Sequence, residues 1–390
     1  MANALTTALG RINSTASTPL ALNTAYDTKY GTYLKLFSGE LFKGFQHNTI
    51  ARDLVTKRTL KNGKSLQFIY AGRMEAAYHT PGTPILGNEN ALPVAEKTIV
   101  MDDLLISSAF VYDLDETLSH YELRGEISKK IGYALAENYD RKIFRAITRG
   151  ARKASPISAT NRVEPGGTQI RVGTSTADDA LDGTKLVNAF YDAAAALDEK
   201  GVSSAGRCGV ISPRQYYALI NDVSSGVISN GLVNRDVQGS ALQSGSGVIE
   251  IAGIKLYKSM NIPFFGNYGT KYGTAGADNP GSTSPGNLGN FVGADMADET
   301  DAVDGINNNY GADEKFAHSC GLIFQKEAAG VVEAIGPQVQ VTNGDVSVIY
   351  QGDVILGRLA MGADYLNPAA CVELIAGAAT ANAGEATDAW

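Results

Sequence analysis

Apolar residues recur at every fourth position through a long proline-free stretch, from Tyr112 to Gly150. Because four residues are close to one turn of an α-helix, these side chains share one face. Asp113 is the expected N-cap, with Glu116 at the N3 position of a capping box. The stretch therefore predicts one helix much longer than the ~11–12 residues usual in globular proteins. Its apolar stripe consists of Ile127, Ile131, Leu135, Tyr139, Ile143 and Ile147.

Two glycines, Gly125 and Gly132, lie inside this predicted helix. A glycine costs about 1 kcal/mol relative to alanine in a helix interior. One interpretation is that close packing against another element requires them. The other is that the helix bends there, and the residues alone leave both interpretations open.

A period of two governs the segment before the helix. Leu66, Phe68 and Tyr70 alternate with polar residues, and β-prone residues return over 96–113, so both stretches predict strands. The turn formers of residues 79–93 exclude a regular element between them. We therefore expect a long two-stranded arm with an irregular tip. Since two strands alone are marginally stable in water, a neighbouring subunit is the simplest support for it.

The dipeptide Asn62-Gly63 lies between two β-prone runs. It predicts a hairpin with a type I′ turn, which needs a positive φ at both central residues. Gly63-Lys64-Ser65 also resembles the end of a phosphate-binding loop. Arg58 stands where that motif needs a glycine, and a strand pattern follows where it needs a helix, so we reject a nucleotide site.

The second half of the chain mixes helix and strand patterns. Residues 182–201 predict a helix that ends at Gly201, and Ser212 with Pro213 predicts the N-cap and N1 of a short helix. Residues 264–312 have no period and are rich in Gly, Asn, Asp and Ser, which is typical of a surface insertion. The remaining predictions are strands at 207–211, 246–263, 319–325, 345–351 and 353–366, and a helix at 326–336.

Candidate chemistry is sparse. The formal net charge of −8 argues against free nucleic-acid affinity, which needs a basic surface. The three cysteines form no CxxC pair and the four histidines form no metal-binding motif. Acidic residues between 295 and 304 lack the spacing of a calcium loop and are interpreted as a solvated loop. No apolar run approaches the ~20 residues of a membrane span, and no signal peptide is recognised. We therefore predict no catalytic, cofactor-binding or metal site and no membrane partner.

Four stretches carry a resemblance to a known family. They are NGKSLQFIYAGRMEAAYHTPG, EKTIVMDDLLISSAFVYDLDETLSHYELRGE, LIFQKEAAGVV and AMGADYLNPAACVEL. The chain resembles the major capsid proteins of tailed double-stranded DNA phages, which have the Hong Kong 97-type fold. It is most similar to the T-seven-like podovirus branch. The resemblance covers most of residues 30–375 and weakens in 264–312 and at both ends.

The resemblance implies an α+β fold with an N-terminal arm, a two-stranded E-loop, a P-domain built on a long spine helix, and an α/β A-domain. The A-domain would carry the Gly/Asn/Asp-rich insertion 264–312. The implied boundaries are 1–51 for the arm, 52–110 for the E-loop, 111–155 for the spine helix, 156–342 for the A-domain, 343–377 for the returning P-domain strands and 378–390 for a disordered tail.

The implied function is structural. Hexamers and pentamers of the chain would assemble in the host bacterial cytoplasm into the icosahedral shell of a virion, which encloses double-stranded DNA without sequence-specific binding. A separate scaffolding protein and a portal are the expected partners, and a decoration protein is an optional one. An encapsulin-like cargo shell is the alternative, and a soluble enzyme with an unrecognised site is a remote one.

The resemblance also nominates particular residues. Gly125 and Gly132 are the positions where the spine helix would bend. The E-loop tip, Thr80 to Glu96, contains no lysine, so no isopeptide cross-link to another subunit is expected. The residues expected in assembly contacts at the tip are His79, Thr80, Pro81, Gly82, Pro84 and Pro93. Basic groups that would face the interior, with a solvated helix end as the equal alternative, are Arg141, Lys142, Arg145, Arg149 and Arg152.

Overall fold

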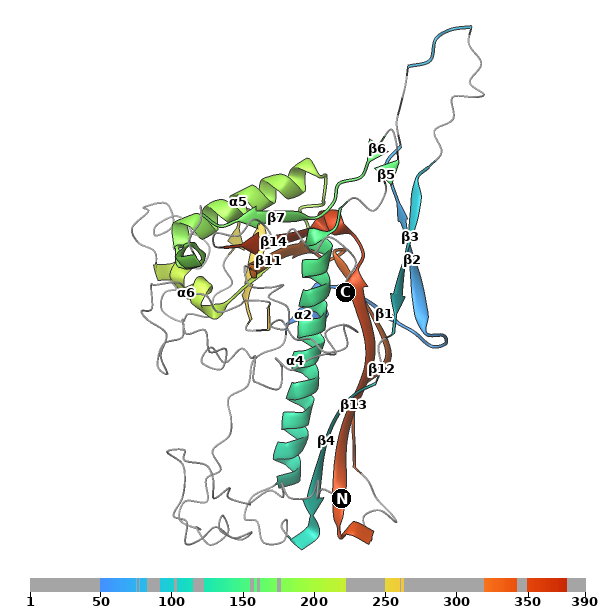
Figure 1. Ribbon diagram of the computed structural model, residues 1–390, viewed down its shortest axis with the longest axis vertical. Coiled ribbons are helices and arrows are strands. Elements are labelled where there is room, and N and C mark those ends of the chain that lie inside the picture. The colour runs from blue at the N-terminus through green and yellow to red at the C-terminus, as the bar shows by residue number, and fades with distance from the viewer. Residues whose placement is uncertain are drawn as a thin grey trace. The chain divides into compact units, whose positions relative to one another are not determined.

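A computed structural model describes residues 50–74, 76, 78–82, 92–101, 104–114, 123–154, 158–159, 162–173, 177–221, 250–259, 261–262, 319–341 and 349–376 (Figure 1). The predictions for residues 1–49, for the insertion 264–312 and for residues 377–390 fall outside these ranges. The chain divides into two compact units. The first comprises Met1–Gln46, Leu104–Ala136 and Ile335–Ala360, and the second comprises His47–Asp103, Glu137–Ala334 and Met361–Trp390.

The predicted long helix is confirmed as α4, Leu123–Arg152, which is 30 residues long. All six residues of its apolar stripe are buried. The first half of α4 belongs to the first unit and the second half to the second. The expected cap at Asp113 and Glu116 stays a prediction, because residues 115–122 lie outside the described ranges.

In the first unit, α4 lies on two long strands. β4, Leu105–Tyr112, pairs antiparallel with β13, Gly352–Tyr365, from Tyr112↔Gly352 to Leu105↔Leu359. A Cβ atom at Gly357 would collide with Ile131 and come within 2.9 Å of Leu135, so this glycine lets the helix approach the strand. Arg124 Nη1 also contacts Asp353 Oδ2 at 2.7 Å.

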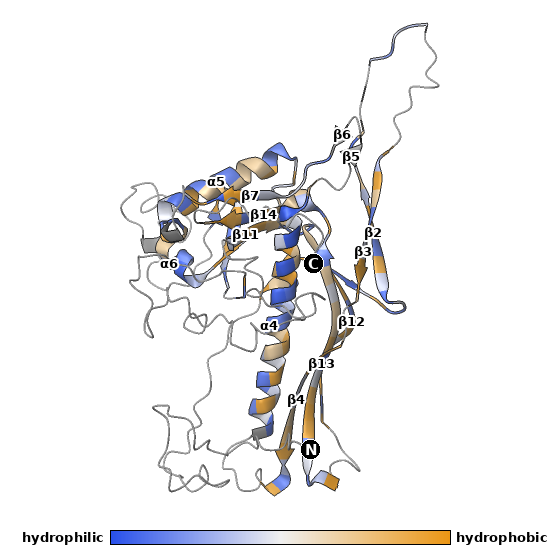
Figure 2. Ribbon diagram, viewed as in Figure 1, coloured by the Kyte–Doolittle hydropathy of each residue, from blue (hydrophilic) through white to orange (hydrophobic). Residues whose placement is uncertain are grey.

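The second unit contains a six-stranded sheet in the order β7-β14-β11-β8-β10-β9. Every residue of β8, β11 and β14 is buried, as continuous apolar runs such as LIF in β11 and LI in β14 require. Figure 2 shows these strands as hydrophobic, while α5 alternates between hydrophobic and hydrophilic turns. The bounds are β7 Thr168–Arg171, β8 Arg207–Ile211, β9 Glu250–Ile251, β10 Ile254–Lys258, β11 Ser319–Gln325 and β14 Cys371–Ile375.

Both predicted helix starts in this unit are confirmed. Asp182 caps α5, Gly183–Glu199, by accepting from the backbone N–H groups of Thr184 and Lys185. Ser212 caps α6, Pro213–Asn221, and the Gln215 side chain accepts from the Ser212 N–H at 2.9 Å, which completes a capping box. Gly201 follows α5 with a φ of +72°, as expected for a glycine just past a helix end. Single-turn 3₁₀ helices lie at Ala177–Leu181 and Pro368–Ala370.

Two predictions on the neighbouring strands are wrong. Residues 326–336 do not form a helix: a turn at Lys326 and Glu327 leads into β12, Ala329–Val341. Residues flanking Asn62-Gly63 do not form a hairpin, because β1, Thr56–Thr59, pairs in parallel with β12 instead. Gly63 has a φ of +94°, but Asn62 is not among the positive-φ residues, so the turn is not of type I′.

The strand order of the resulting four-stranded sheet is β1-β12-β13-β4. In the predicted strand 345–351, the described residues Ile349 and Tyr350 are helical instead. A short helix α2, Ala51–Leu54, precedes β1, and residues Ser158–Ala159 and Arg162–Val163 form the small antiparallel pair β5 and β6.

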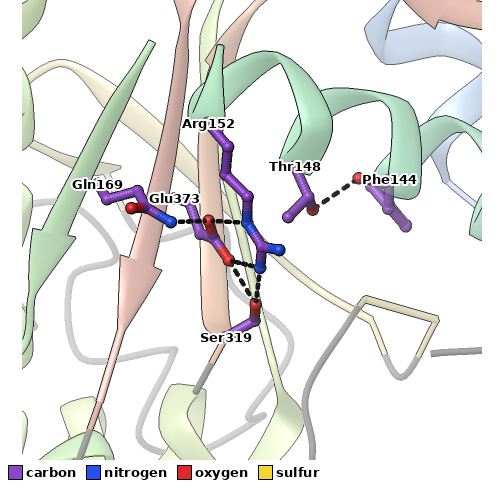
Figure 3. A network of polar contacts seen from close by, with 6 residues as sticks. All are labelled: Phe144, Thr148, Arg152, Gln169, Ser319 and Glu373. Carbon is purple, nitrogen blue, oxygen red and sulfur yellow. Dashed lines mark hydrogen bonds and ion pairs between the residues drawn. The ribbon is translucent and has the colours of Figure 1, made fainter. Parts of the chain in front are cut away.

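A buried ion pair joins the last residue of α4 to the six-stranded sheet (Figure 3). Arg152 donates through Nε to Glu373 Oε2 at 2.8 Å and through Nη2 to Glu373 Oε1 at 2.7 Å. Gln169 of β7 donates to the same carboxylate at 2.8 Å, and the hydroxyl of Ser319 donates to it from β11. Both charged side chains are almost fully buried. Both oxygens of the Glu373 carboxylate therefore accept hydrogen bonds, as a buried charge requires.

Replacing Arg152 with alanine should lower the free energy of unfolding by about 3–5 kcal/mol, because it leaves the buried Glu373 charge unpaired. Urea denaturation of the unassembled chain measures this. Arg58→Ala is the control, because Arg58 is exposed on β1 and its loss should change the value by less than about 0.5 kcal/mol. A loss below about 1 kcal/mol for Arg152→Ala would contradict the assignment.

Candidate assembly surface

The predicted two-stranded arm is confirmed as a ribbon of β2, Ser65–Ala71, and β3, Val94–Val100. The strands pair antiparallel from Ser65↔Val100 to Ala71↔Val94 and form a sheet of their own. One more hydrogen bond closes each end: Met101 N–H to Lys64 O and Gly72 N–H to Pro93 O, both 2.8 Å. We call β2 and β3 together the ribbon.

The two faces of the ribbon differ in exposure. One face carries Leu66, Phe68 and Tyr70, which are half-buried, and Ile99, which is buried. The other face carries Ile69, Val94 and Val100, which are 78%, 56% and 51% exposed. The same face also carries exposed polar residues, among them Gln67 and Glu96, so the three apolar side chains stand out on a mixed surface. Large exposed apolar groups of this kind make the face a candidate contact surface.

The apolar exposure continues beyond the ribbon. Met74, Tyr78 and Leu92 are exposed at the start and end of the tip. Of the residues expected in assembly contacts there, His79, Thr80, Pro81 and Gly82 are exposed and Pro93 is half-buried, whereas Pro84 lies outside the described residues. Gly82 has a φ of +92°, which explains a glycine in this turn.

Charged groups hold the ribbon at Lys97, in the middle of β3, and a close backbone contact holds its end at Val100. Lys97 Nζ lies 2.7 Å from Asp364 Oδ2 and 3.9 Å from the centroid of the Tyr365 ring. Arg149, from the last turn of α4, reaches the other oxygen of Asp364 at 3.7 Å. Gly362 brings β13 against the backbone of Val100 so closely that a Cβ atom would collide with it. We call Lys97, Asp364, Tyr365 and Arg149 the root tie.

The five basic residues near the end of α4 that were expected to face the interior differ in how deeply they are buried. Arg141, Arg145 and Arg152 are buried, whereas Lys142 and Arg149 are half-buried. Arg141 pairs with Glu137 at 2.6 Å. Arg152 pairs with Glu373 inside the second unit, and the expectation that these basic groups face the interior of a shell stays a prediction.

The two glycines at which α4 was expected to bend, Gly125 and Gly132, are half-buried. A Cβ atom at Gly132 would meet no atom within 4 Å in the described structure. Close packing therefore does not explain Gly132.

Two buried carboxylates that the sequence did not single out hold the segment before the ribbon. Asp140 of α4 accepts from the backbone N–H groups of Ile50 at 2.9 Å and Ala51 at 3.1 Å, and from Asn261 at 3.3 Å. Burial raises the pKa of Asp140 to about 6. An acidic residue next to the apolar stripe, directly after Tyr139, was the only available signal.

Glu333 of β12 is the second carboxylate. It accepts from Lys57 Nζ at 2.6 Å and the Tyr139 hydroxyl at 2.7 Å, with Arg52 at 3.4 Å. Burial opposes its ionisation, but these hydrogen bonds and charges outweigh burial and lower the pKa of Glu333. The ion pairs tie β1 and α2 to β12 and α4.

The other titratable groups suggest no chemistry. Burial raises the pKa of Cys208 to about 12 and also raises those of Cys320 and Cys371, so these thiols are protonated at neutral pH. Within the described ranges, no group of His, Cys, Asp and Glu could hold a metal ion. Among the described helices, none is long and apolar enough to cross a membrane.

Comparison with known proteins identifies the family. Residues 67–303 match the model of the Gp10A-like family, described as major capsid protein. The chain belongs to this capsid protein family.

Individual relatives agree with the family match. The major capsid proteins of Escherichia phage T7 and Enterobacteria phage T3 are 28% and 26% identical to the chain over 197 and 198 residues. Each match covers 49% of this chain and 56% of the relative, so the chain spans about half the length of these curated relatives. The capsid structure of cyanophage P-SCSP1u is 30% identical, with a TM-score of 0.64, and the match covers 92% of this chain and 97% of that one.

These matches confirm the resemblance and the Hong Kong 97-type fold of this Gp10A-like chain. In that fold the ribbon is the E-loop and α4 is the spine helix. The exposed ribbon face, the root tie and the two buried carboxylates therefore belong to a subunit of a phage capsid.

The raised pKa of Asp140 predicts a pH dependence of stability. Between its unfolded value of 3.8 and about 6, the folded chain binds more protons than the unfolded chain, so the free energy of unfolding rises as pH falls from 7 to 5. The full gain below pH 4 would be about 3 kcal/mol, since one pKa unit is worth about 1.4 kcal/mol. Asp140→Asn should lose this contribution. Urea denaturation of both proteins at pH 7 and 5 measures it, and equal pH dependence in the two would contradict the prediction.

Proposed function

We propose that this capsid subunit assembles as hexamers and pentamers into an icosahedral shell that encloses double-stranded DNA without sequence-specific contacts. The observation that supports this most directly is the ribbon, a separate two-stranded sheet whose outer face exposes Ile69, Val94 and Val100. Such a ribbon gains stability by covering that face on a neighbouring copy. Each contact can be modest, because every subunit of a closed shell engages several neighbours at once.

The finer parts of the proposal rest on the family. Assembly takes place in the host bacterial cytoplasm, with a separate scaffolding protein and a portal as partners and a decoration protein as an optional one. The domain boundaries given above, from the arm at 1–51 to the tail at 378–390, are part of the proposal. An encapsulin-like cargo shell is not favoured, because the family model and the curated relatives are phage capsid proteins.

A charge on the exposed ribbon face should block assembly. Ile69→Asp would replace the most exposed apolar side chain of this face with a second carboxylate directly opposite Glu96. The lost apolar contact and the like-charge pair should reduce shells at least tenfold while the unassembled chain stays folded. Electron microscopy and sedimentation velocity measure shells, and circular dichroism checks folding. Ile69→Val is the matched control at the same position. Wild-type shell yields for Ile69→Asp would contradict the role of this face.

The glycines of α4 supply a test of shell maturation. We propose that the helix bends at Gly125 and Gly132 in the immature shell and straightens as the shell expands. Alanine at both positions should favour the straight helix by about 1 kcal/mol per site and impair formation of the immature shell or its expansion. The space around Gly132 admits the added methyl group. Particle diameters by electron microscopy report expansion, and normally expanding double-mutant shells would count against the bend.

A further inference from the structure

The ribbon has a second polar attachment on the side of its tip, at Arg73. The backbone N–H of Arg73 donates to Glu164 Oε1 at 2.6 Å, and its Nε lies 3.6 Å from Glu164 Oε2. Its Nη2 donates to the backbone carbonyl of Lys200. One arginine, directly after the last hydrogen bond of the ribbon, thus contacts two segments that lie 91 and 127 residues further along the chain.

The acceptors of Arg73 are built into the second unit. The Glu164 side chain is only 4% exposed. The pKa of Tyr70 on the ribbon is raised, first because Tyr70 is partly buried and second because the negative charge of Glu164 lies nearby. Lys200 is the C-cap of α5, where the helix dipole places negative charge that favours a guanidinium. Arg73 therefore meets a carboxylate and a polarised carbonyl together.

The segment that carries Glu164 is itself held in place. Lys200 Nζ donates to the Gly166 carbonyl at 2.5 Å and to the Thr168 hydroxyl. The Gly167 N–H donates to Lys153 O at 2.8 Å, and a Cβ atom on Gly167 would collide with the carbonyls of Gly150 and Ala151. Residues 164–168 thus rest on the end of α4. We call Arg73, Glu164 and the Lys200 carbonyl the outer tie.

The two ties act at different points and on different strands. Lys97 of the root tie is on β3, opposite Phe68, whereas Arg73 of the outer tie follows β2. Arg73 lies five positions after Phe68, which is roughly 17 Å along an extended strand. A ribbon held at one point can pivot about it. Attachment of both strands at two separated points restricts the directions that the ribbon can take.

We propose that Arg73 is a positioning residue for assembly, which with Glu164 and the Lys200 carbonyl holds the ribbon in its docking direction before a neighbouring subunit binds. The proposal rests on the proposed function, because it assumes that the ribbon docks on another copy. Holding the ribbon beforehand removes part of the ordering entropy that docking would otherwise cost. The outer tie thereby lowers the concentration at which subunits assemble.

The test separates positioning from stability and from docking. Amide hydrogen exchange of residues 65–72 and 93–100 is measured in the unassembled wild-type chain and in Arg73→Ala, Glu164→Gln and the double variant. Global unfolding in urea and the subunit concentration needed for shells are measured on the same proteins. Arg58→Ala removes the same charge from an exposed site on β1 and is the matched control.

We expect ribbon exchange to become about three- to tenfold faster in Arg73→Ala, the effect of losing one or two hydrogen bonds, with unchanged exchange in β8 and β11. The assembly concentration should rise by a similar factor, global unfolding should stay at the wild-type midpoint, and the double variant should add little to either single change. Wild-type exchange in Arg73→Ala would overturn the proposal. Faster exchange with unchanged assembly would leave the tie in place but remove its role in assembly, and failure of the wild-type chain itself to form shells would instead refute the proposed function.

Discussion

The buried pair of Arg152 and Glu373 is the interaction on which the arrangement of the second unit depends. Removing two charges from water costs several kcal/mol per ion, so the pair is tolerated only because its geometry is bidentate and Gln169 and Ser319 satisfy the remaining positions. An apolar contact would bury the same surface without fixing a register. This pair instead sets the last residue of α4 against three strands of the sheet at once.

The last turn of α4 then collects the attachments of the ribbon. Arg149, one turn before Arg152, shares Asp364 with Lys97 of the ribbon. Gly150 lies so close to Tyr365 and Cys371 that a Cβ atom would come within 2.8 Å of both. The carbonyls of Gly150 and Ala151 support the segment that carries Glu164. The direction of the ribbon is therefore set by the same few residues that join helix and sheet.

Local patterns in the sequence predicted those elements whose hydrogen bonds join residues close in the chain, or whose repeat continues over many residues. α4, the helix α5 and its end at Gly201, the cap of α6 at Ser212, and the pairing of β2 with β3 follow from spacing and from single residues. The wrong predictions for β12 and for the hairpin at β1 share one cause. Residues 326–336 contain alanines and a glutamate that favour a helix, yet Gly330, Val331 and Val332 pair with β1, about 270 residues earlier in the chain. The turn at Gly63 was recognisable, but the partner of β1 was not, and neither was that of Arg152, which lies 221 residues away. Periodicity carries no information on such distant partners, so the residues that hold the candidate site together could not be paired from the sequence.

The ribbon combines two kinds of interaction that serve different ends. Burial of Ile69, Val94 and Val100 would supply free energy for association, but the hydrophobic effect has no preferred direction. Direction must come from contacts with defined geometry, and the ion pairs and hydrogen bonds at Lys97 and Arg73 have it. Arg73 is 54% exposed, so its pair with Glu164 is weak by itself, and a weak tie suits this task. A strong tie would hold the ribbon rigidly, whereas a weak one biases its direction and still lets it adjust when it docks.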